Sequence, residues 1–516
     1  MQRRIPLATI LVLLALPASA AADTFTVTRT DDPPTYAGLC SASDCSLRSA
    51  VQSASMSDGN KIVIPEGTYT VNTGGSGANG ELVLTKAMTI AGAGARTTII
   101  TATGGGRLFT VSSNVAMSGV TLTGGVANSD GGGAILISGS GARLDLGAST
   151  LRGNKASGST SSTGGAIYDN GGTLNIANST FNSNRSGESS LTPASGGAIA
   201  TTGPTTLTNV TISGNVVNGL TAAGGGVSTA GASPPVSVVN STIAGNGAVG
   251  SLSASGGNLD LGSSSSVLNS IVAGGVGAGG SENCAGPLGS QGHNIDSLDQ
   301  CGFHAGGDKP GTDPQIGPLQ DNAGPTDTRA IPATSPAVDA GAAQGCPVTD
   351  ERGLPRPQGN GCDIGAFEYL PPRKPGEPPS ALVIQPGTGR IIDTFAGAKL
   401  KSRRIVVKGK YAIVVITCPA GTPGYCLVND TLFADTRLPR KRAAAKKLAK
   451  IGSTTVKMKP GKTQSVKVKL SKKALKKIKR KHKLKSTLVM LSRDSLFTST
   501  ATATPVTLVQ KKKRKR

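Results

Sequence analysis

Gly132-Gly133-Ala134-Ile135 opens a phrase of about thirty residues that is written five times between residues 131 and 280. The phrase returns as Gly164-Gly165-Ala166-Ile167, Gly196-Gly197-Ala198-Ile199, Gly224-Gly225-Gly226-Val227 and Gly256-Gly257-Asn258-Leu259. The second half of each copy carries polar residues six positions apart, as in Asn178/Asn184, Asn209/Asn215 and Asn240/Asn246, with Ala148/Asn154 and Asn269/Gly275 as imperfect end copies. A fixed period of this size is typical of solenoids, propellers and repeat arrays.

The residue types in the repeat decide between these architectures. Short runs of Val, Ile, Leu and Thr alternate with Gly, Ser and Asn, and no copy has apolar residues at helical spacing. Such short strands bury themselves only by stacking in parallel, coil upon coil, at steps of roughly 4.8 Å. Propeller blades need longer strands, and this chain has no Trp and only 3% aromatic residues. The sequence predicts an all-β protein built on a right-handed parallel β-helix.

The recurring asparagines predict a structural ladder. Identical amides at one position of every coil lie above one another and can hydrogen-bond along the axis. We expect this ladder to contain Asn154, Asn178, Asn184, Asn209, Asn215, Asn240 and Asn246. Three of these residues also match the Asn-x-Ser/Thr acceptor pattern for N-glycosylation. We attribute the matches to the repeat itself.

Residues 1–22 have the features of a secretory signal peptide. Arg3 and Arg4 precede an apolar run at residues 10–16, and Ala18-Ser19-Ala20 forms a small-residue cleavage site. The run is too short to span a bilayer, and no later stretch approaches roughly twenty apolar residues. We expect a secreted protein, extracellular or associated with the cell surface.

The eight cysteines agree with an oxidising compartment. Metal binding is the weaker interpretation, because the chain has no Cys-x-x-Cys and its three histidines, His293, His304 and His482, are scattered. We expect no metal and no cofactor. Eight cysteines permit 105 connectivities, and the most economical set is the local one, Cys40/Cys45, Cys284/Cys301, Cys346/Cys362 and Cys418/Cys426.

Residues 23–72 are predicted to cap the N-terminal end of the solenoid. Leu47, Ala50, Val51 and Ala54 fall on one helical face, so a short amphipathic helix can cover apolar ends and open strand edges there. The sequence Cys45-Ser46-Leu47-Arg48-Ser49-Ala50 resembles the CSLREA domain of secreted bacterial proteins, with Ser49 where that family has Glu. The resemblance implies a cap and no particular activity.

Residues 73–280 are predicted to form the β-helix, with the five copies at 131–280. The Gly-Gly-Ala-Ile phrase together with Thr180-Phe181-Asn182-Ser183-Asn184 resembles the repeats of chlamydial polymorphic outer-membrane proteins, and the whole is similar to the pectate-lyase-like β-helix. The first of these resemblances implies a surface-displayed β-helix.

Residues 281–369 are predicted to form the distal cap. Their Asp, Asn, Pro and Gly are typical of tight turns. They resemble the choice-of-anchor Q domain of bacterial surface proteins, which implies display at the surface and leaves the attachment open; the matching motifs are Asp313-Pro314, Gly317-Pro318-Leu319, Asp321-Asn322, Gly324-Pro325-Thr326, Ser335-Pro336-Ala337, Asp339-Ala340-Gly341, Arg352-Gly353, Arg356-Pro357 and Cys362-Asp363-Ile364-Gly365-Ala366-Phe367-Glu368.

Beyond a Pro-rich linker at residues 370–379, the charge of the chain reverses. Residues 370–516 hold 37 of the 53 Lys and Arg but 5 of the 29 Asp and Glu, a formal charge of +32. Alternating apolar and lysine residues around Val466-Lys467-Val468-Lys469 are typical of strands with one buried and one wet face. We predict a small basic β-sandwich-like domain at residues 380–508 and a basic disordered tail at 509–516.

The sequence favours a non-catalytic, adhesin-like or envelope-associated surface protein. A domain of this charge attracts polyanions, so we expect anionic cell-envelope polymers or surface glycans as partners. The interleaving of arginine with aromatic residues that stacks on bases is lacking, so we expect no specific nucleic-acid binding, and we expect a monomer. The basic C-terminal module would hold the protein to the polymer.

The alternative function is that of a polysaccharide lyase or glycoside hydrolase of the pectate-lyase-like type. These enzymes need clustered acids, bases or calcium ligands. In the predicted register, Asp145 stacks on Asn175, Thr206, Ser237 and Ser266, whereas Asp169 lies over Ile137 and Thr201. Asp363 and Glu368 are expected on opposite faces of a terminal strand. We therefore expect no catalytic residues.

Overall fold

The structure is a computed structural model of the 516-residue chain. It describes residues 22–33, 39–74, 80–188, 191–229, 234–277, 282–371, 382–384, 391–393, 398–419, 426–433, 450–459, 461–493 and 499–510. The predicted signal peptide, Pro-rich linker and basic tail lie almost entirely outside these residues. The chain divides into two compact units, Met1–Arg373 and Lys374–Arg516.

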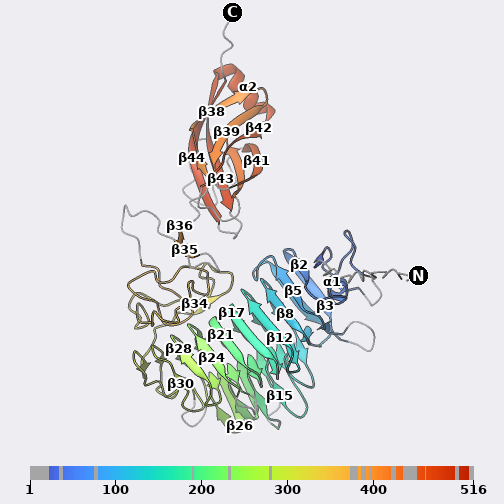
Figure 1. Cartoon of the computed structure of the whole chain (residues 1–516), viewed down its shortest axis with the longest axis vertical. Helices are drawn as coiled ribbons and strands as arrows, with labels where there is room; N and C mark the ends of the chain where they lie inside the picture. The colour runs from blue at the N-terminus through green and yellow to red at the C-terminus, as the bar shows by residue number, and fades with distance from the viewer. Residues whose placement is uncertain are drawn as a thin grey trace, which may run out of the picture. The chain divides into compact units, whose positions relative to one another are not determined.

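The first unit is a parallel β-solenoid of about seven turns in a chain that is nearly all β, as the repeat predicts (Figure 1). Its coils contribute strands to three sheets. The largest sheet, sheet A, contains β1 (Thr24–Thr26), β2 (Asn60–Ile64), β3 (Gly67–Asn72), β5 (Met88–Gly92), β6 (Thr98–Thr103), β8 (Asn114–Ser118), β9 (Thr121–Thr123), β12 (Arg143–Gly147), β13 (Thr150–Arg152), β17 (Thr173–Asn182), β21 (Thr205–Ser213), β24 (Val236–Val239), β25 (Thr242–Ala244), β28 (Ser266–Leu268), β29 (Ile271–Ala273), β30 (Gly289–Ser290), β31 (Ile295–Asp296) and β32 (Lys309–Pro310).

Two smaller sheets contribute the remaining strands of the coils. Sheet B contains β4 (Leu82–Leu84), β7 (Phe109–Val111), β11 (Ile135–Ser138), β16 (Ile167–Asn170), β20 (Ile199–Thr201), β23 (Val227–Ser228) and β27 (Leu259–Asp260). Sheet C contains β10 (Val126–Ala127), β14 (Lys155–Ala156), β15 (Ser162–Thr163), β18 (Arg185–Ser186), β19 (Ala194–Ser195), β22 (Val216–Ala223) and β26 (Gly247–Ser255).

The Gly-Gly-Ala-Ile phrase leads into the strands of sheet B. Steric constraints explain the residue types at its Ile position and at its two glycines. The Ile position stacks in register from coil to coil as Ile135, Ile167 and Ile199, each fully buried. The first glycine has positive φ, 63° at Gly164. At the second, Gly165, a Cβ would lie 2.2 Å from the carbonyl oxygen of the next coil. Only glycine therefore allows the coils to approach this closely.

The first asparagine of each pair lies at a bend of sheet A, which is inside β17 and β21 in two coils and between β24 and β25 or β28 and β29 in the next two. Asn178, Asn209, Asn240 and Asn269 all adopt positive φ between 43° and 52°. Asparagine is the non-glycine residue that tolerates this left-handed conformation well. The residue type is thus selected by backbone geometry as well as by side-chain bonding.

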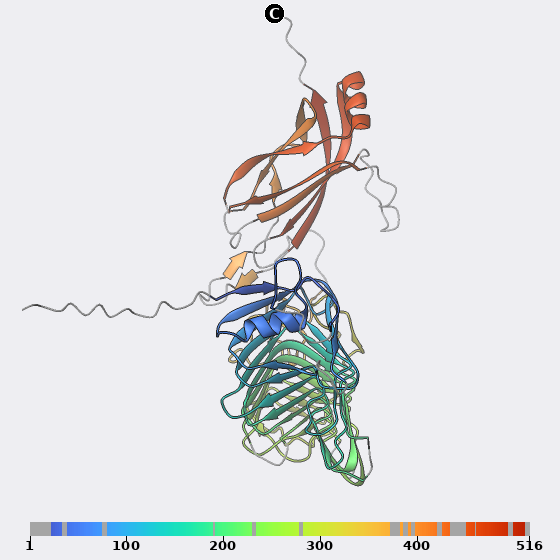
Figure 2. The same ribbon diagram turned by 90° about the vertical axis from the view of Figure 1, so that its right-hand side faces the viewer.

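The predicted N-terminal helix is α1 (Leu47–Ala54), and it covers the N-terminal end of the solenoid (Figure 2). Ser46 caps it by accepting a hydrogen bond from the Ser49 backbone N–H. Ser49 stands where a capping box has Glu, and its hydroxyl bonds that of Ser46 at 3.0 Å. Arg48 forms a buried pair with Asp32, with both carboxylate oxygens within 2.9 Å of the guanidinium. Arg48 also donates to the Gly80 carbonyl at 2.8 Å, and this bond ties the cap to the chain that follows it.

Residues 282–371 have two parts, where the sequence suggested one distal cap. The first part adds half-coils through β30, β31 and β32, and its buried Cys284, Leu288, Cys301 and Phe303 extend the apolar core. The second part, residues 313–369, runs back along one side of the solenoid and contains only the short pair β33 (Leu319–Gln320) and β34 (Thr328–Arg329) (Figure 1). We call residues 313–369 the side clasp.

The cysteines form the four local pairs that sequence economy favours. Cys284–Cys301 lies in the solenoid core, and Cys346–Cys362 joins two loops of the side clasp. Cys418–Cys426 links β39 to β40, two strands that do not pair with each other.

The second unit is built on one sheet of eight strands, β37 (Lys399–Leu400), β38 (Arg404–Lys408), β39 (Tyr411–Thr417), β40 (Cys426–Phe433), β41 (Lys450–Met458), β42 (Thr463–Lys469), β43 (Lys483–Arg493) and β44 (Ser499–Gln510). The sheet curls over one apolar core, and the N–H of Ser471 after β42 bonds the carbonyl of Ile451 in β41 at 2.8 Å. The structure thus shows one curled sheet in the region where we predicted a β-sandwich-like domain. A small hairpin, β35 (Leu382–Ile384) and β36 (Ile391–Asp393), precedes it.

The helix α2 (Lys472–Lys481) of the second unit is absent from the sequence-based expectation. Ser471 caps its N-terminus, and Ala474 and Ile478 face the core. Its remaining residues are mostly lysine. The short apolar face is therefore difficult to recognise from the sequence pattern of an amphipathic helix.

The stacking account is tested by a matched pair of glycine substitutions. Gly165→Ala places a Cβ against the backbone of the next coil, so we expect the free energy of unfolding to fall by about 2 kcal/mol or more. Gly141 has no neighbouring atom within 4 Å of the added Cβ, so Gly141→Ala should change it by less than about 0.5 kcal/mol. Chemical denaturation of both variants measures the difference. Equal effects would contradict the stacking argument.

Candidate functional site

A buried amide ladder runs through the solenoid. The side-chain Nδ2 of each residue donates to the Oδ1 of the next at 2.9 to 3.0 Å, in the order Asn154, Asn184, Asn215, Asn246, Asn258 and Asn283. All six side chains are almost fully buried. Asn258 and Asn283 were missed because they do not come from the paired-asparagine position. Asn258 replaces the Ala of the Gly-Gly-Ala phrase. This replacement is the sequence feature that could have indicated its place in the ladder.

The other predicted ladder residues form a separate column with a different role. Asn209 donates to Asn178 and Asn269 donates to Asn240, both at 3.1 Å. The same amides also reach the side clasp, because Asn209 donates to the Thr349 carbonyl at 2.7 Å and Asn240 to the Asp363 carbonyl at 3.1 Å. This column is therefore a docking edge for the side clasp.

Glu351 of the side clasp inserts into a cage of threonine hydroxyls. Thr180 and Thr211 occupy paired positions in adjacent coils, and their hydroxyls lie 2.9 and 2.5 Å from the Glu351 carboxyl oxygens. Thr326 supplies a third hydroxyl at 3.0 Å. Complete burial raises the pKa of Glu351 well above its ordinary value, although the three hydroxyl bonds act in the opposite direction.

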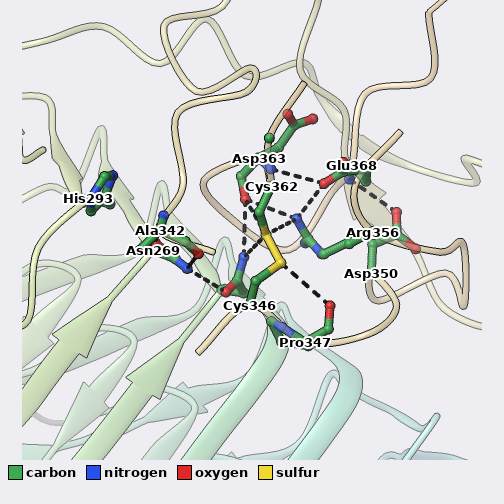
Figure 3. Close-up of a disulfide and its surroundings, with 12 residues drawn as sticks. Asn269, His293, Ala342, Cys346, Pro347, Asp350, Arg356, Cys362, Asp363 and Glu368 are labelled. Atoms are coloured by element: carbon green, nitrogen blue, oxygen red, sulfur yellow. Dashed lines mark hydrogen bonds and ion pairs between the residues drawn. A yellow bond between two sulfur atoms is a disulfide. The ribbon is translucent and has the colours of Figure 1, made fainter. Parts of the chain in front are cut away.

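A second set of buried charges holds the loops of the side clasp to each other (Figure 3). Arg356 and Glu368 form an ion pair at 2.8 Å, with both side chains fully buried. Arg352 pairs with Asp350 at 2.7 Å, and its guanidinium lies 3.5 Å from the ring centre of Phe367. The Arg-Gly and Arg-Pro motifs of this segment thus carry a structural network.

Asp363 and Glu368, weighed as a carboxylate pair from the sequence, both belong to this network. Burial, and then the charge of Glu368, raises the pKa of Asp363 to about 7. The Asp363 carboxylate accepts from the backbone N–H groups of Asp339 and Tyr369, and Glu368 accepts from the Asp363 N–H at 3.0 Å. Their hydrogen bonds go to backbone N–H groups and, for Glu368, also to Arg356, as in a structural clasp.

The outer face of sheet A carries a shallow groove of about 400 Å³, lined on β8, β12, β17 and β21. Its polar lining residues include Asp145 and Asn175, whose side chains bond at 2.8 Å, and Arg143 pairs with Asp145 at 3.0 Å beside it. In the register of the strands Asp145 stacks on Asn175, Thr206, Ser237 and Ser266, as the repeat predicts.

The acids of the solenoid occupy separate columns. Asp169 pairs in register with Ile137 and Thr201 in sheet B. It is buried and accepts from the Thr201 hydroxyl and the Gly172 N–H, and burial raises its pKa. In the part of the chain that the structure describes, no three His, Cys, Asp or Glu side chains are grouped as a metal site.

The C-terminal unit presents the strongest chemical feature of the molecule, a surface of basic side chains. Between residues 398 and 510 the structure describes the side chains of twenty Lys and Arg, and every one of them is exposed. In contrast, residues 374–516 contain only five acids, Glu377, Asp393, Asp430, Asp435 and Asp494. The alternating strands and α2 turn their aliphatic residues inward and their ammonium groups outward.

Within this surface, one pocket of about 550 Å³ gathers charged groups from β38, the end of α2 and the start of β43. Its lining residues are Arg404 and Val406 of β38, Lys481 and His482 at the end of α2, Lys483 of β43, and Val509 and Gln510 of β44. His482 ends the helix in a left-handed conformation, and its carbonyl accepts the Gln510 N–H at 3.2 Å. The helix end and the strand are therefore fixed to each other.

No family profile matches the chain, and no curated protein shows significant similarity to it. No helix among the described residues is long and apolar enough to cross a membrane.

The ladder is tested by Asn215→Ala. The Asn215 amide makes bonds to Asn184, Asn246 and the Phe181 carbonyl, and its loss leaves buried partners unsatisfied. Each unsatisfied buried group costs about 1 to 3 kcal/mol, so we expect the free energy of unfolding to fall by roughly 3 kcal/mol. Asn170→Ala, at an exposed position, is the control and should cost less than about 0.5 kcal/mol. Denaturant titration would reject the ladder if both variants lost the same amount.

The threonine cage predicts an unusual pH dependence. An acid whose pKa is higher in the folded than in the unfolded state stabilises the fold at low pH, and this contribution is lost as pH rises through the raised pKa. We expect Glu351→Gln to remove that loss, so the stability difference between variant and wild type should shift in favour of the variant as pH rises above 4.5. Thr211→Val leaves the Glu351 carboxyl in place, so the stability of this variant should still fall as pH rises. Thermal denaturation across pH that shows a constant difference for Glu351→Gln would contradict the account.

Proposed function

We propose that this chain is a secreted, non-catalytic surface protein that its basic C-terminal unit holds to an anionic polymer of the cell envelope. The observation that carries the proposal is the exposure of all twenty described Lys and Arg side chains between residues 398 and 510. With a formal charge of +32 over residues 370–516, such a surface attracts a polyanion over distances of about a Debye length.

The solenoid unit supplies the part that is displayed. Residues 1–369 carry 16 Lys and Arg against 24 Asp and Glu, so they lack the cationic character of the second unit. Disulfide pairs in both units suit an oxidising environment outside the cytosol. The resemblance of residues 23–72 to the CSLREA domain and of residues 281–369 to the choice-of-anchor Q domain supports secretion and surface display.

The alternative is a β-helix polysaccharide lyase or glycoside hydrolase acting in the groove of sheet A. Arg143 and Asp145 favour it, because a cation and a carboxylate lie together on an exposed strand face. A two-carboxylate mechanism needs a second acid about 5 to 10 Å away. In register with Asp145 the neighbouring coils place Ala116 and Asn175, so the surface-protein proposal is the better supported of the two.

The proposal is tested by salt-dependent binding. Residues 23–516 and residues 23–371 are each sedimented with isolated anionic envelope polymer over a series of salt concentrations. We expect the longer chain to pellet at low salt and to be released progressively as salt rises, because binding displaces condensed counterions. The shorter chain should stay in the supernatant. Equal pelleting of both chains, or binding of the longer chain that does not change with salt, would contradict the proposal.

A further inference from the structure

The outer face of the C-terminal sheet has an ordered pattern of charge. Alternate residues of β38, β39 and β44 enter the core, so Val406, Ile413 and Val509 lie on the outer face, where all three are partly exposed. The strand register places these three residues in one row across the sheet, with Lys467 of β42 at one end and Lys483 of β43 at the other. An aliphatic strip with a cation at each end therefore crosses this face.

The neighbouring rows repeat the basic frame. Arg404 of β38 pairs with Thr507 of β44, which pairs with Lys485 of β43. On the other side, Lys408 pairs with Tyr411, which pairs with Lys469 of β42. The side chains of Arg404, Lys408, Lys469 and Lys485 are all exposed.

The 550 Å³ pocket lies at the Lys483 end of the row. Arg404, Lys481 and Lys483 surround a floor to which Val406 and Val509 contribute. None of the seven described residues that line the pocket is acidic. The pocket thus concentrates three positive charges around a small apolar base, which distinguishes it from the lysines spread over α2.

We propose that this pocket binds a phosphate group, so that the polymer held by the C-terminal unit is a phosphate-containing one. This inference rests on the proposed function and names the partner chemistry of the same domain. The planar guanidinium of Arg404 matches the two free oxygens of a phosphodiester, while Lys481 and Lys483 supply point charges to the same two oxygens from other directions. Val406 and Val509 can contact the carbon chain that links successive phosphates. A carboxylate also has two oxygens, but they lie in one plane with its carbon, so the two lysines have fewer directions from which to approach them than at a tetrahedral phosphate.

The test compares two double variants of the full mature chain with equal loss of charge. Arg404→Ser with Lys483→Ser removes two pocket cations, and Lys472→Ser with Lys476→Ser removes two exposed lysines of α2 outside the pocket. Binding of fluorescent tripolyphosphate is measured at physiological salt. We expect the pocket variant to lose at least tenfold in affinity and the helix variant to lose less than threefold. All four positions are exposed, and an unchanged thermal unfolding midpoint checks that both variants fold.

A conservative variant separates geometry from charge. Arg404→Lys keeps the charge and removes the planar fork, so we expect a three- to tenfold loss for tripolyphosphate. If charge alone mattered, this variant would bind as the wild type does, and the pocket assignment would be wrong. Equal losses for the two double variants would also overturn the assignment, while salt-dependent binding of the wild type to envelope polymer would leave the proposed function standing.

Two further ligands identify the source of the phosphate. Poly-glutamate of matched charge should bind at least fivefold more weakly than polyphosphate, and equal or tighter binding would refute phosphate selectivity. Vesicles containing phosphatidylglycerol should not compete with soluble polyphosphate at equal phosphate concentration. Stronger binding to the vesicles would move the phosphate from a polymer to a lipid headgroup and overturn the polymer assignment. Wild-type chain that binds none of these ligands and no envelope polymer would refute the proposed function as well.

Discussion

The coil-to-coil spacing of the parallel strands, about 4.8 Å, is the constraint on which the rest of the solenoid depends. At this separation there is no room for a Cβ where two coils cross most closely, and the second glycine of the phrase meets a carbonyl oxygen of the next coil, as at Gly165 and Gly197. The same spacing lets each buried asparagine amide hydrogen-bond to the asparagine amide of the next coil, as Asn184 does with Asn215. The sequence therefore repeats because every coil must satisfy the same spacing to the next coil.

The same spacing creates the surface on which the side clasp docks. The column of Asn178, Asn209, Asn240 and Asn269 presents an amide in four successive coils. Threonines in register, such as Thr180 and Thr211, can bind a single carboxyl between them. The clasp reaches as far as Arg96, which pairs with Asp327 at 2.8 Å across 231 positions of sequence. Such buried and long-range bonds, rather than regular strands, give residues 313–369 their shape.

The repeat, the apolar column and the four cysteine pairs could be predicted because each has a local or periodic signal. The side clasp could not, since the partner of Glu351 lies on coils far away in the sequence and its residues have no period. Asn258 was missed because a ladder position was filled from the other half of the repeat. In the basic unit, the alternation around Val466 indicated a strand, whereas the surplus of lysine in residues 472–481 concealed α2. The pocket at Arg404 depends on the pairing of β38 with β44, which no sequence pattern indicates.

The central claim is the proposal that the solenoid unit is displayed and that the C-terminal unit attaches the protein. It is tested most directly by hydrogen–deuterium exchange on the full mature chain with and without isolated anionic envelope polymer. The account predicts new protection confined to the C-terminal unit, strongest in β38, in the end of α2 and in the start of β43. Protection that falls instead on β8, β12 and β17 would place binding in the groove of the solenoid and contradict the claim.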